Sequence, residues 1–274
     1  MQDIEIAEIR KLTEVIKNNY DYDFSNYAMS SFKRRIQRIM EIYSFNSVDS
    51  LVKRVKNDKP FFSDFITNIT VNVTEMFRDP SFWRELRDTV LPDLLHPNKK
   101  LTIWHAGCSS GEEVFSMCIM LREMGVLEQV KIIATDLDEV ILEKAIKGQY
   151  QLKSMDLNEK NYVRFIGKRI LPDYYKEENG LVQMDQTLLK NVSFRKHDLV
   201  NGKMNYKFDL ILCRNVMIYF NQSLQNEVLK KLYESLYKNG HLIIGSKESL
   251  IWSEIASKFT AINSEEKIFK KIKD

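Results

Sequence analysis

The sequence has few cysteines, prolines and glycines, and it lacks any long apolar run. Three cysteines among 274 residues, without the paired spacing of a metal site, exclude a disulfide framework. They fit reduced thiols, so we expect a cytoplasmic protein without a bound metal. No stretch approaches the roughly 20 apolar residues that a membrane helix needs, and the acidic N-terminus 1–5 does not resemble a secretory signal. We therefore expect a soluble protein that does not insert into membranes.

An excess of one charge is also missing. Lys and Arg number 41 against 38 Asp and Glu, which gives a formal net charge of +3. Proteins that bind nucleic acid usually show a strong basic excess, so we expect no nucleic-acid partner. The hydrophobic fraction of 44% is too high for a disordered chain. At roughly 150 residues per domain, the length allows one large domain, or an ordinary domain with a smaller companion, and we expect a monomer.

The periodicity of the apolar residues changes near Leu95. Before this point they recur at helical spacing, and no strand is evident. After it, short apolar runs alternate with helical stretches, which favours a parallel sheet covered by helices on both faces. The expected strands are 101–104, 130–134, 192–194, 208–213 and 242–244, and the expected helices are 112–123, 139–147 and 223–237.

Two segments depart from this alternation. Residues 259–262 and 268–272 flank a polar turn and predict an antiparallel hairpin at the end of the sheet. The connection at 150–190 is far longer than the usual link of about 2–6 residues, so it must hold structure of its own. There we expect a helix at 158–165, and Asn179-Gly180 predicts a hairpin because both residues tolerate positive φ.

The predicted fold class is therefore α/β. We expect a Rossmann-like sheet with a C-terminal antiparallel hairpin and a small inserted β subdomain, preceded by an all-α N-terminal domain. The boundaries we place are 1–70 for the all-α domain, 71–99 for a linker and connecting helix, and 100–274 for the α/β domain, with the insert at 150–190.

The most informative local feature is a strand that runs through small residues into a helix, AGCSSGEE at 106–113. Small residues let the backbone approach a ligand closely, and the start of the helix presents free N–H groups. The loop lacks the second glycine of the dinucleotide-binding G-x-G-x-x-G pattern, which disfavours a pyrophosphate. One strand–helix unit later, Asp136 ends a strand with a carboxylate that can accept hydrogen bonds from ribose hydroxyls. Together these features predict an adenosine site.

Each of these residues also has a simpler interpretation. Gly107 and Gly111 could serve a tight turn without any ligand, and Asp136 could cap the following helix. Glu112 and Glu113 could only place favourable charges in the first turn of a helix. It is their combination in this order that favours a ligand site.

Three separated motifs carry a resemblance to a known family. They are NVTEMFRDP at 72–80, the loop at 106–113, and CRNVMIYF at 213–220. In this order and spacing they resemble the CheR family, the chemotaxis-receptor glutamate methyltransferases, over nearly the whole chain. The resemblance implies a Rossmann-like methyltransferase domain that uses S-adenosylmethionine and releases S-adenosylhomocysteine. Its implied substrates are glutamate side chains in the cytoplasmic helical region of chemotaxis receptors, whose conversion to methyl esters tunes adaptation.

The resemblance also implies a set of site residues. Those that would bind the cofactor are Asn72, Thr74, Arg78, Gly107, Glu113, Asp136, Asp198, Leu199, Arg214 and Asn215. A glutamate side chain, with a pKa of ~4.3, is already ionised near neutral pH, so the reaction needs no general base. We hypothesise that Arg78 and Tyr219 are the catalytic residues and orient the incoming carboxylate for in-line attack.

Structural roles are the alternative for several of these side chains. Asn72 and Thr74 could shape a loop before a helix that Asp79 caps, with a proline at its first position. Arg78 could be an interdomain ion-pair partner, and Tyr219 could be a half-buried core aromatic.

Residues 31–43 predict a helix with an apolar stripe and a basic face that is exposed to solvent. The candidate docking residues on it are Lys33, Arg34, Arg35 and Arg38. Residues 1–80 hold twelve Lys or Arg and twelve Asp or Glu, so this group is a local concentration in a neutral segment. Such a concentration suits docking onto an acidic helical surface, although a solvated helix face is the ordinary interpretation. Two further functions stay open: a methyltransferase for another protein or a small molecule, and a non-catalytic module that senses S-adenosylmethionine.

Overall fold

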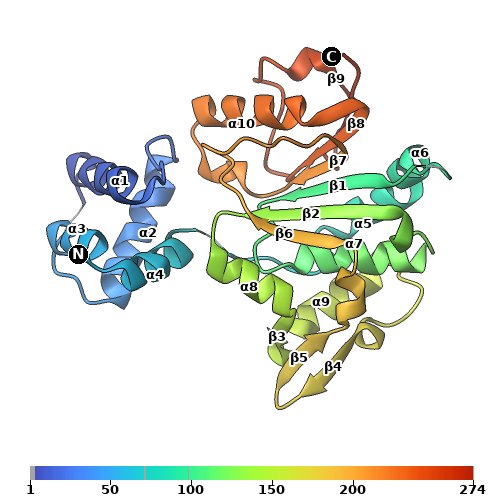
Figure 1. Ribbon diagram of the computed structural model, residues 1–274, viewed down its shortest axis with the longest axis horizontal. Helices are drawn as coiled ribbons and strands as arrows, with labels where there is room; N and C mark the ends of the chain where they lie inside the picture. The colour runs from blue at the N-terminus through green and yellow to red at the C-terminus, as the bar shows by residue number, and fades with distance from the viewer. Residues whose placement is uncertain (1–3, 71, 98, 274) are drawn as a thin grey trace.

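The computed structural model describes residues 4–70, 72–97 and 99–273 (Figure 1). Residues 1–3, 71, 98 and 274 lie outside the described residues. They include part of the acidic N-terminus 1–5 and part of the predicted linker 71–99. Within the described ranges, no helix is long and apolar enough to cross a membrane.

Four helices form the N-terminal part of the fold. They are α1 (Ile6–Tyr20), α2 (Met29–Ile42), α3 (Val48–Asn57) and α4 (Lys59–Ile69). Ser47 and Asp58 start α3 and α4, because their side chains accept hydrogen bonds from backbone N–H groups in the first turns. The apolar stripes of the helices meet in one core that includes Leu12, Ile36 and Phe65. The expected all-α start of the chain is confirmed.

A seven-stranded mixed sheet forms the centre of the second part. Its strands are β1 (Leu101–Ala106), β2 (Val130–Asp136), β6 (Val192–Lys196), β7 (Phe208–Cys213), β8 (Leu236–Ile244), β9 (Phe259–Asn263) and β10 (Ile268–Lys271). They lie in the order β6-β2-β1-β7-β8-β10-β9. The first five are parallel, whereas β10 runs antiparallel to both β8 and β9. This confirms the expected Rossmann-like sheet and its C-terminal hairpin.

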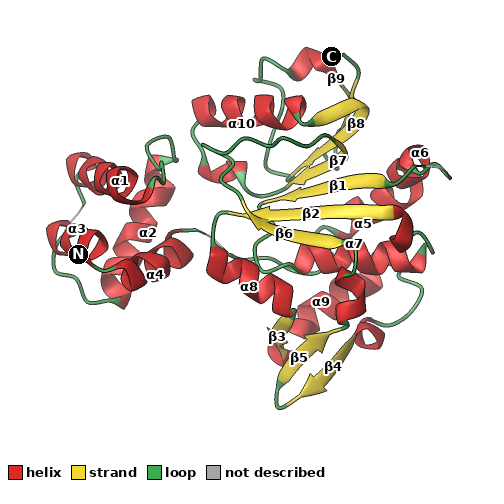
Figure 2. Ribbon diagram, in the orientation of Figure 1, coloured by secondary structure: helices red, strands yellow, loops and turns green. Residues whose placement is uncertain are grey.

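Helices cover both faces of the sheet (Figure 2). On one face α7 (Glu112–Glu123) packs in a core with Ile103 and Ile132, and on the other α10 (Gln222–Glu234) packs in a core with Trp104 and Ile133. Successive strand residues point to opposite faces, which explains why neighbours in sequence belong to different cores. The helix α8 (Glu139–Lys147) follows β2. Both α7 and α8 have the bounds expected from the sequence.

The segment between the domains and the insert are the remaining parts. A short helix α5 (Pro80–Glu85), a π-helical turn and α6 (Leu91–Leu94) lead into β1. The insert holds α9 (Leu152–Phe165) and a separate antiparallel sheet in the order β3-β5-β4, which lies apart from the main sheet in Figure 2. Its strands are β3 (Gln149–Gln151), β4 (Tyr175–Glu178) and β5 (Leu181–Met184). Asn179 and Gly180, with φ of 53° and 74°, make the predicted turn between β4 and β5.

Two expected helix bounds are wrong. The helix expected at 158–165 is only the second half of α9. The helix expected at 223–237 ends at Glu234 instead, because Ser235 closes its last turn and Leu236 pairs with Phe208 of β7. The last two residues of the expected helix, 236 and 237, therefore begin β8, which is much longer than the expected strand 242–244.

Candidate functional site

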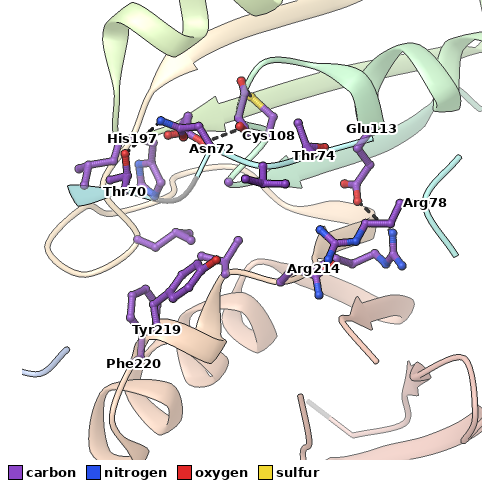
Figure 3. A pocket seen from close by; sticks show the side chains of 18 of the residues that line it. Thr70, Asn72, Thr74, Arg78, Cys108, Glu113, His197, Arg214, Tyr219 and Phe220 are labelled. Atoms are coloured by element: carbon purple, nitrogen blue, oxygen red, sulfur yellow. Dashed lines mark hydrogen bonds and ion pairs between the residues drawn. The ribbon is translucent and has the colours of Figure 1, made fainter. Parts of the chain in front are cut away.

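One pocket opens at the carboxyl edge of the parallel strands, where it meets the N-terminal helices (Figure 3). It encloses about 1020 Å³ of space, some of it open to solvent. All the expected cofactor-binding and catalytic residues line it: Asn72, Thr74, Arg78, Gly107, Glu113, Asp136, Asp198, Leu199, Arg214, Asn215 and Tyr219. The carboxyl edge is where open α/β sheets bind ligands, and the fold brings this whole set together there.

The glycine loop after β1 is shaped by close packing. Gly107 has a φ of +80°, and a Cβ there would lie 2.5 Å from a methyl group of Val216 in the turn after β7. Gly111 has a φ of +92°, and a Cβ there would lie 2.9 Å from Ala145 of α8. Both glycines are thus required by the turn itself, while the loop still contributes Gly107, Cys108 and Ser109 to the pocket wall.

Asp136 ties this loop to the end of β2. One of its carboxylate oxygens accepts a 2.8 Å hydrogen bond from the backbone N–H of Ser109, and the other accepts a hydrogen bond from the backbone N–H of Asp138. The side chain that caps α8 is Asp138, which accepts bonds from the N–H groups of Val140 and Ile141. The capping interpretation of Asp136 is therefore wrong. Burial raises the pKa of Asp136 above its ordinary value.

Charged side chains alternate along the pocket wall beside α7. Glu113 lies 2.8 Å from Nδ1 of His105 and 3.3 Å from Arg214, whose other Nη atom lies 2.6 Å from Asp79. Burial alone would raise the pKa of Glu113, but the His105 hydrogen bond and the Arg214 charge together hold it below its ordinary value. Arg78 lines the same pocket as Arg214 and this carboxylate, and Figure 3 shows all three side chains. Glu113 is thus more than a favourable charge in a first turn.

The segment that carries Arg78 is fastened to three helices. The backbone N–H groups of Met76 and Phe77 donate to Asn158 of α9 and Ser116 of α7. The indole N–H of Trp83 donates to the Arg78 carbonyl at 3.0 Å. These bonds explain how a loop can hold Arg78 against the pocket.

Asp79, which stands before α5, has a different role from the one expected. It occupies the position before the helix, but with a φ of 56° and no capping hydrogen bond from its side chain. Its carboxylate pairs with Arg214 instead. This ion pair links the connecting segment to the turn after β7, whereas a capping hydrogen bond would stay within the connecting segment.

Two predicted side chains hold their own loops as well as lining the pocket. The amide of Asn72 donates to the Thr67 carbonyl and the Thr70 hydroxyl. The Asp198 carboxylate accepts from the N–H of Val200 and the amide of Asn201. The loop-shaping interpretation of Asn72 is therefore correct and is compatible with its place at the pocket.

Arg35 corrects the expected docking surface. Arg34 and Arg38 are exposed and Lys33 is half-buried, whereas Arg35 is only 8% exposed. It follows the buried Phe32 by three positions, which places it on the apolar side of α2. Its guanidinium donates to the Ile69 carbonyl at 2.7 Å and lines the pocket. Arg35 is therefore not part of the exposed basic face.

Sequence reasoning missed two further features of the site. Glu248, only 6% exposed, accepts hydrogen bonds from the backbone N–H groups of Asn215, Met217, Ile218 and Gly245. The only sequence signal for it is its place just after β8, at the same edge of the sheet. His197 also lines the pocket, and burial lowers its pKa.

The comparisons with known proteins agree with this geometry. The model of the CheR methyltransferase SAM-binding domain matches residues 72–268, and that of the CheR methyltransferase all-alpha domain matches residues 7–70. This chain belongs to the CheR methyltransferase family. It binds S-adenosylmethionine through the domain that the first model describes.

Two curated CheR relatives cover most of the chain. A protein described as putative methyltransferase Cher3, from Pseudomonas putida, is 40% identical over 96% of both chains. A chemotaxis protein methyltransferase from Listeria monocytogenes is 34% identical over 87% of this chain and 88% of its own. Among solved structures, the N-methyltransferase NodS of Bradyrhizobium japonicum in complex with S-adenosylhomocysteine is 14% identical. It covers 81% of this chain and 97% of its own with a TM-score of 0.39.

The pocket of this CheR chain has groups that suit S-adenosylmethionine. Asp136 offers a carboxylate acceptor for ribose hydroxyls, and the cations Arg78 and Arg214 suit a carboxylate. Among the described residues, the buried Ser109 hydroxyl and the Nε of Arg214 have no hydrogen-bond partner. Buried polar groups are nearly always hydrogen-bonded, so these two atoms fit a polar ligand in the pocket.

Proposed function

We propose that this chain is a protein-glutamate O-methyltransferase that converts glutamates of chemotaxis receptors to methyl esters and thereby tunes receptor adaptation. The observation that carries the proposal is the convergence of eleven expected residues on one pocket, eight of them from the three distant motifs and the other three, Asp136, Asp198 and Leu199, from segments that follow β2 and β6. The family membership and the names of the relatives support it. We further propose a cytoplasmic monomer whose partner is the cytoplasmic helical region of the receptor.

In this proposal the cofactor site has two ends. Asp136 binds the ribose, and Asp198 with Leu199 lies beside the adenine. Glu113, Arg78 and Arg214 surround the charged amino-acid end, with Asn72, Thr74, Gly107 and Asn215 completing the walls. When bound, S-adenosylmethionine supplies a methyl group on a positively charged sulfur.

The substrate carboxylate needs alignment more than activation. It is already ionised near neutral pH, and the transfer cancels two opposite charges, so a site that excludes water favours it. We assign Arg78 and Tyr219 the role of orienting this carboxylate. A tight bidentate clamp would stabilise the nucleophile and slow the reaction, which is why a single hydroxyl beside a cation suits the task. Cys108 takes no part, since burial raises the pKa of its thiol.

The N-terminal helices present the receptor-facing surface in this proposal. We assign residues 1–70 to receptor recognition, 71–99 to the connection and 100–274 to the methyltransferase domain. The exposed Arg34 and Arg38 on α2, with Lys33 beside them, would dock onto an acidic face of the receptor helices.

Incubation of the chain with methyl-labelled S-adenosylmethionine and receptor-containing membranes tests the proposal. We expect base-labile label on the receptor, because methyl esters hydrolyse in alkali. Label on another protein or a small molecule would identify a methyltransferase with a different substrate. Cofactor binding without any transfer would identify a sensing module, and either of these results contradicts the proposal.

A further inference from the structure

The segment that carries Tyr219 is held by the N-terminal helical part. The backbone N–H of Ala28 donates to the Tyr219 carbonyl at 2.8 Å, and that of Asn221 donates to the Asn26 carbonyl at 2.9 Å. Between these bonds, Tyr27 and Phe220 form an antiparallel bridge, with their rings 5.1 Å apart. The connection between α1 and α2 therefore pairs directly with the residues that surround Tyr219.

Arg35 completes this attachment through the side chain of Tyr219. Its guanidinium carbon lies 4.1 Å from the centre of the Tyr219 ring, in a cation–π contact. One of its nitrogens donates to the carbonyl of Ile69, the last residue of α4. Arg35 thus joins α2, the end of α4 and the ring of Tyr219. The hydrogen bond to Ile69 anchors one edge of its planar guanidinium, and one face of the guanidinium lies on the ring.

We infer that Arg35 is a positioning residue that holds Tyr219 in the orientation needed for methyl transfer. The inference rests on the proposed function, in which Tyr219 orients the substrate carboxylate. It also gives the N-terminal part a second role, because this part then supports the reacting geometry as well as binding the receptor.

The chemistry of arginine suits this task better than that of lysine. A guanidinium is planar and can stack on a ring while its edge donates hydrogen bonds, whereas an ammonium is a compact point charge. The anchoring bond to Ile69 restricts how the guanidinium can move. A tyrosine that rests on such a fixed plane loses rotational freedom, and a misplacement of about 1 Å can cost a reaction as much as a hundredfold in rate.

A kinetic comparison of full-length variants tests the inference. In Arg35→Gln and Arg35→Lys we expect kcat for receptor methylation to fall about tenfold, with KM for the receptor and Kd for S-adenosylmethionine within about twofold of wild type. The lysine variant should retain the bond to Ile69 and hence the thermal stability of the wild type. A loss of kcat in Arg35→Lys with unchanged Tm therefore separates positioning from folding.

The exposed neighbour on the same helix provides the matched control. Arg34→Gln should raise KM for the receptor and leave kcat unchanged, because its side chain is exposed and would meet the receptor only. If Arg35→Lys behaves like Arg34→Gln, or if it keeps both parameters of the wild type, the positioning role is overturned.

A double variant distinguishes failure of the inference from failure of the proposed function. If Arg35 acts through Tyr219, the pair Arg35→Lys with Tyr219→Leu should lose no more kcat than Tyr219→Leu alone. Multiplied losses would show that Arg35 acts independently. A wild-type kcat in Tyr219→Leu would instead remove Tyr219 from the mechanism, whatever Arg35 does.

Discussion

The carboxylate of Glu248 accepts a 2.7 Å hydrogen bond from the backbone N–H of Met217 and thereby anchors the turn after β7. The same carboxylate accepts from Asn215 and Ile218 in this turn and from Gly245 at the end of β8. Its two oxygens therefore join neighbouring strands at the edge where the pocket opens. Arg214, Asn215 and Tyr219 all project from the segment held in this way.

We expect Glu248→Gln to lower both stability and activity. The amide NH2 would replace one acceptor oxygen and face two backbone donors, so the free energy of unfolding should fall by about 2–3 kcal/mol. Affinity for S-adenosylmethionine and kcat should fall as well, since the turn carries residues of both sites. Denaturant unfolding, calorimetric binding and the methylation assay measure these changes. Glu254→Gln, at an exposed position nearby, is the control. If Glu248→Gln keeps the stability, cofactor affinity and kcat of the wild type, the carboxylate is dispensable.

A methyl group at Gly107 should disturb the contact between two loops of the pocket. Gly107 and Gly125 share a positive φ, but an added Cβ meets Val216 only at Gly107 and lies in open space at Gly125. We expect Gly125→Ala to cost about 1 kcal/mol through backbone strain, and Gly107→Ala to cost about 1–3 kcal/mol more. Thermal unfolding and S-adenosylmethionine binding check this. Equal losses in the two variants would refute the close approach.

Glu112 should make the fold less stable as the pH rises. It is buried, and burial raises its pKa from an ordinary 4.5 to about 7, despite a hydrogen bond from Ser110. The native state therefore binds more protons than the unfolded chain between about pH 4.5 and 7, so the free energy of unfolding falls as pH rises through this interval. At pH 8 the ionised carboxylate costs up to about 3 kcal/mol.

Replacing this carboxyl by an amide tests the pH dependence. Glu112→Gln should raise the free energy of unfolding at pH 8 by about 1–3 kcal/mol and change it little at pH 4.5. Urea unfolding at the two pH values gives the difference. The exposed Glu143→Gln serves for comparison, and a pH profile of Glu112→Gln that matches wild type would contradict the assignment.

Local signals in the sequence account for much of this fold. The bounds of α7 and α8 follow from the helical spacing of their apolar residues, and the structure shows boundary residues that agree with them: Gly111 precedes α7, and Asp138 and Gly148 flank α8. No such signal marks the end of α10, where Leu236 continues an apolar pattern and only pairing with β7 makes it a strand. The end of α10 was predicted wrongly because a tertiary contact determines it.

The same distinction holds for the site. Residues that follow the strands of a parallel sheet meet at one edge whatever the details of packing, so Gly107 and Asp136 could be predicted at the pocket wall from their strands. Asn72, Thr74 and Arg78 precede the first strand, and only the resemblance to the CheR family implied their place. The roles of Arg35 and Glu248 depend on how separate segments pack. Arg35 reaches the site because α2 contacts the turn that carries Tyr219, and Glu248 reaches it because β8 lies beside β7. A single sequence contains no pattern that pairs them with their partners.

Reversal of two exposed charges on α2 should weaken receptor methylation without affecting the cofactor. In Arg34→Glu with Arg38→Glu we expect KM for the receptor to rise at least tenfold, because charge complementarity sets encounter and orientation. The affinity for S-adenosylmethionine should stay at the wild-type value. Lys53→Glu with Lys56→Glu makes the same change of charge on exposed residues of α3. Equal effects of the two pairs would mean that net charge matters and the position on α2 does not.

Removal of the Tyr219 hydroxyl should slow methyl transfer itself. Tyr219→Phe keeps the ring that stacks on Arg35, and the backbone bond from Ala28 does not involve the side chain. The fold and the pocket should therefore persist, with Kd for S-adenosylmethionine unchanged. If the hydroxyl orients the substrate carboxylate, kcat should fall about ten- to a hundredfold, the range expected for a lost positioning contact. Single-turnover methylation of receptor membranes measures this rate directly, and a wild-type rate would show that the Tyr219 hydroxyl does not orient the substrate carboxylate.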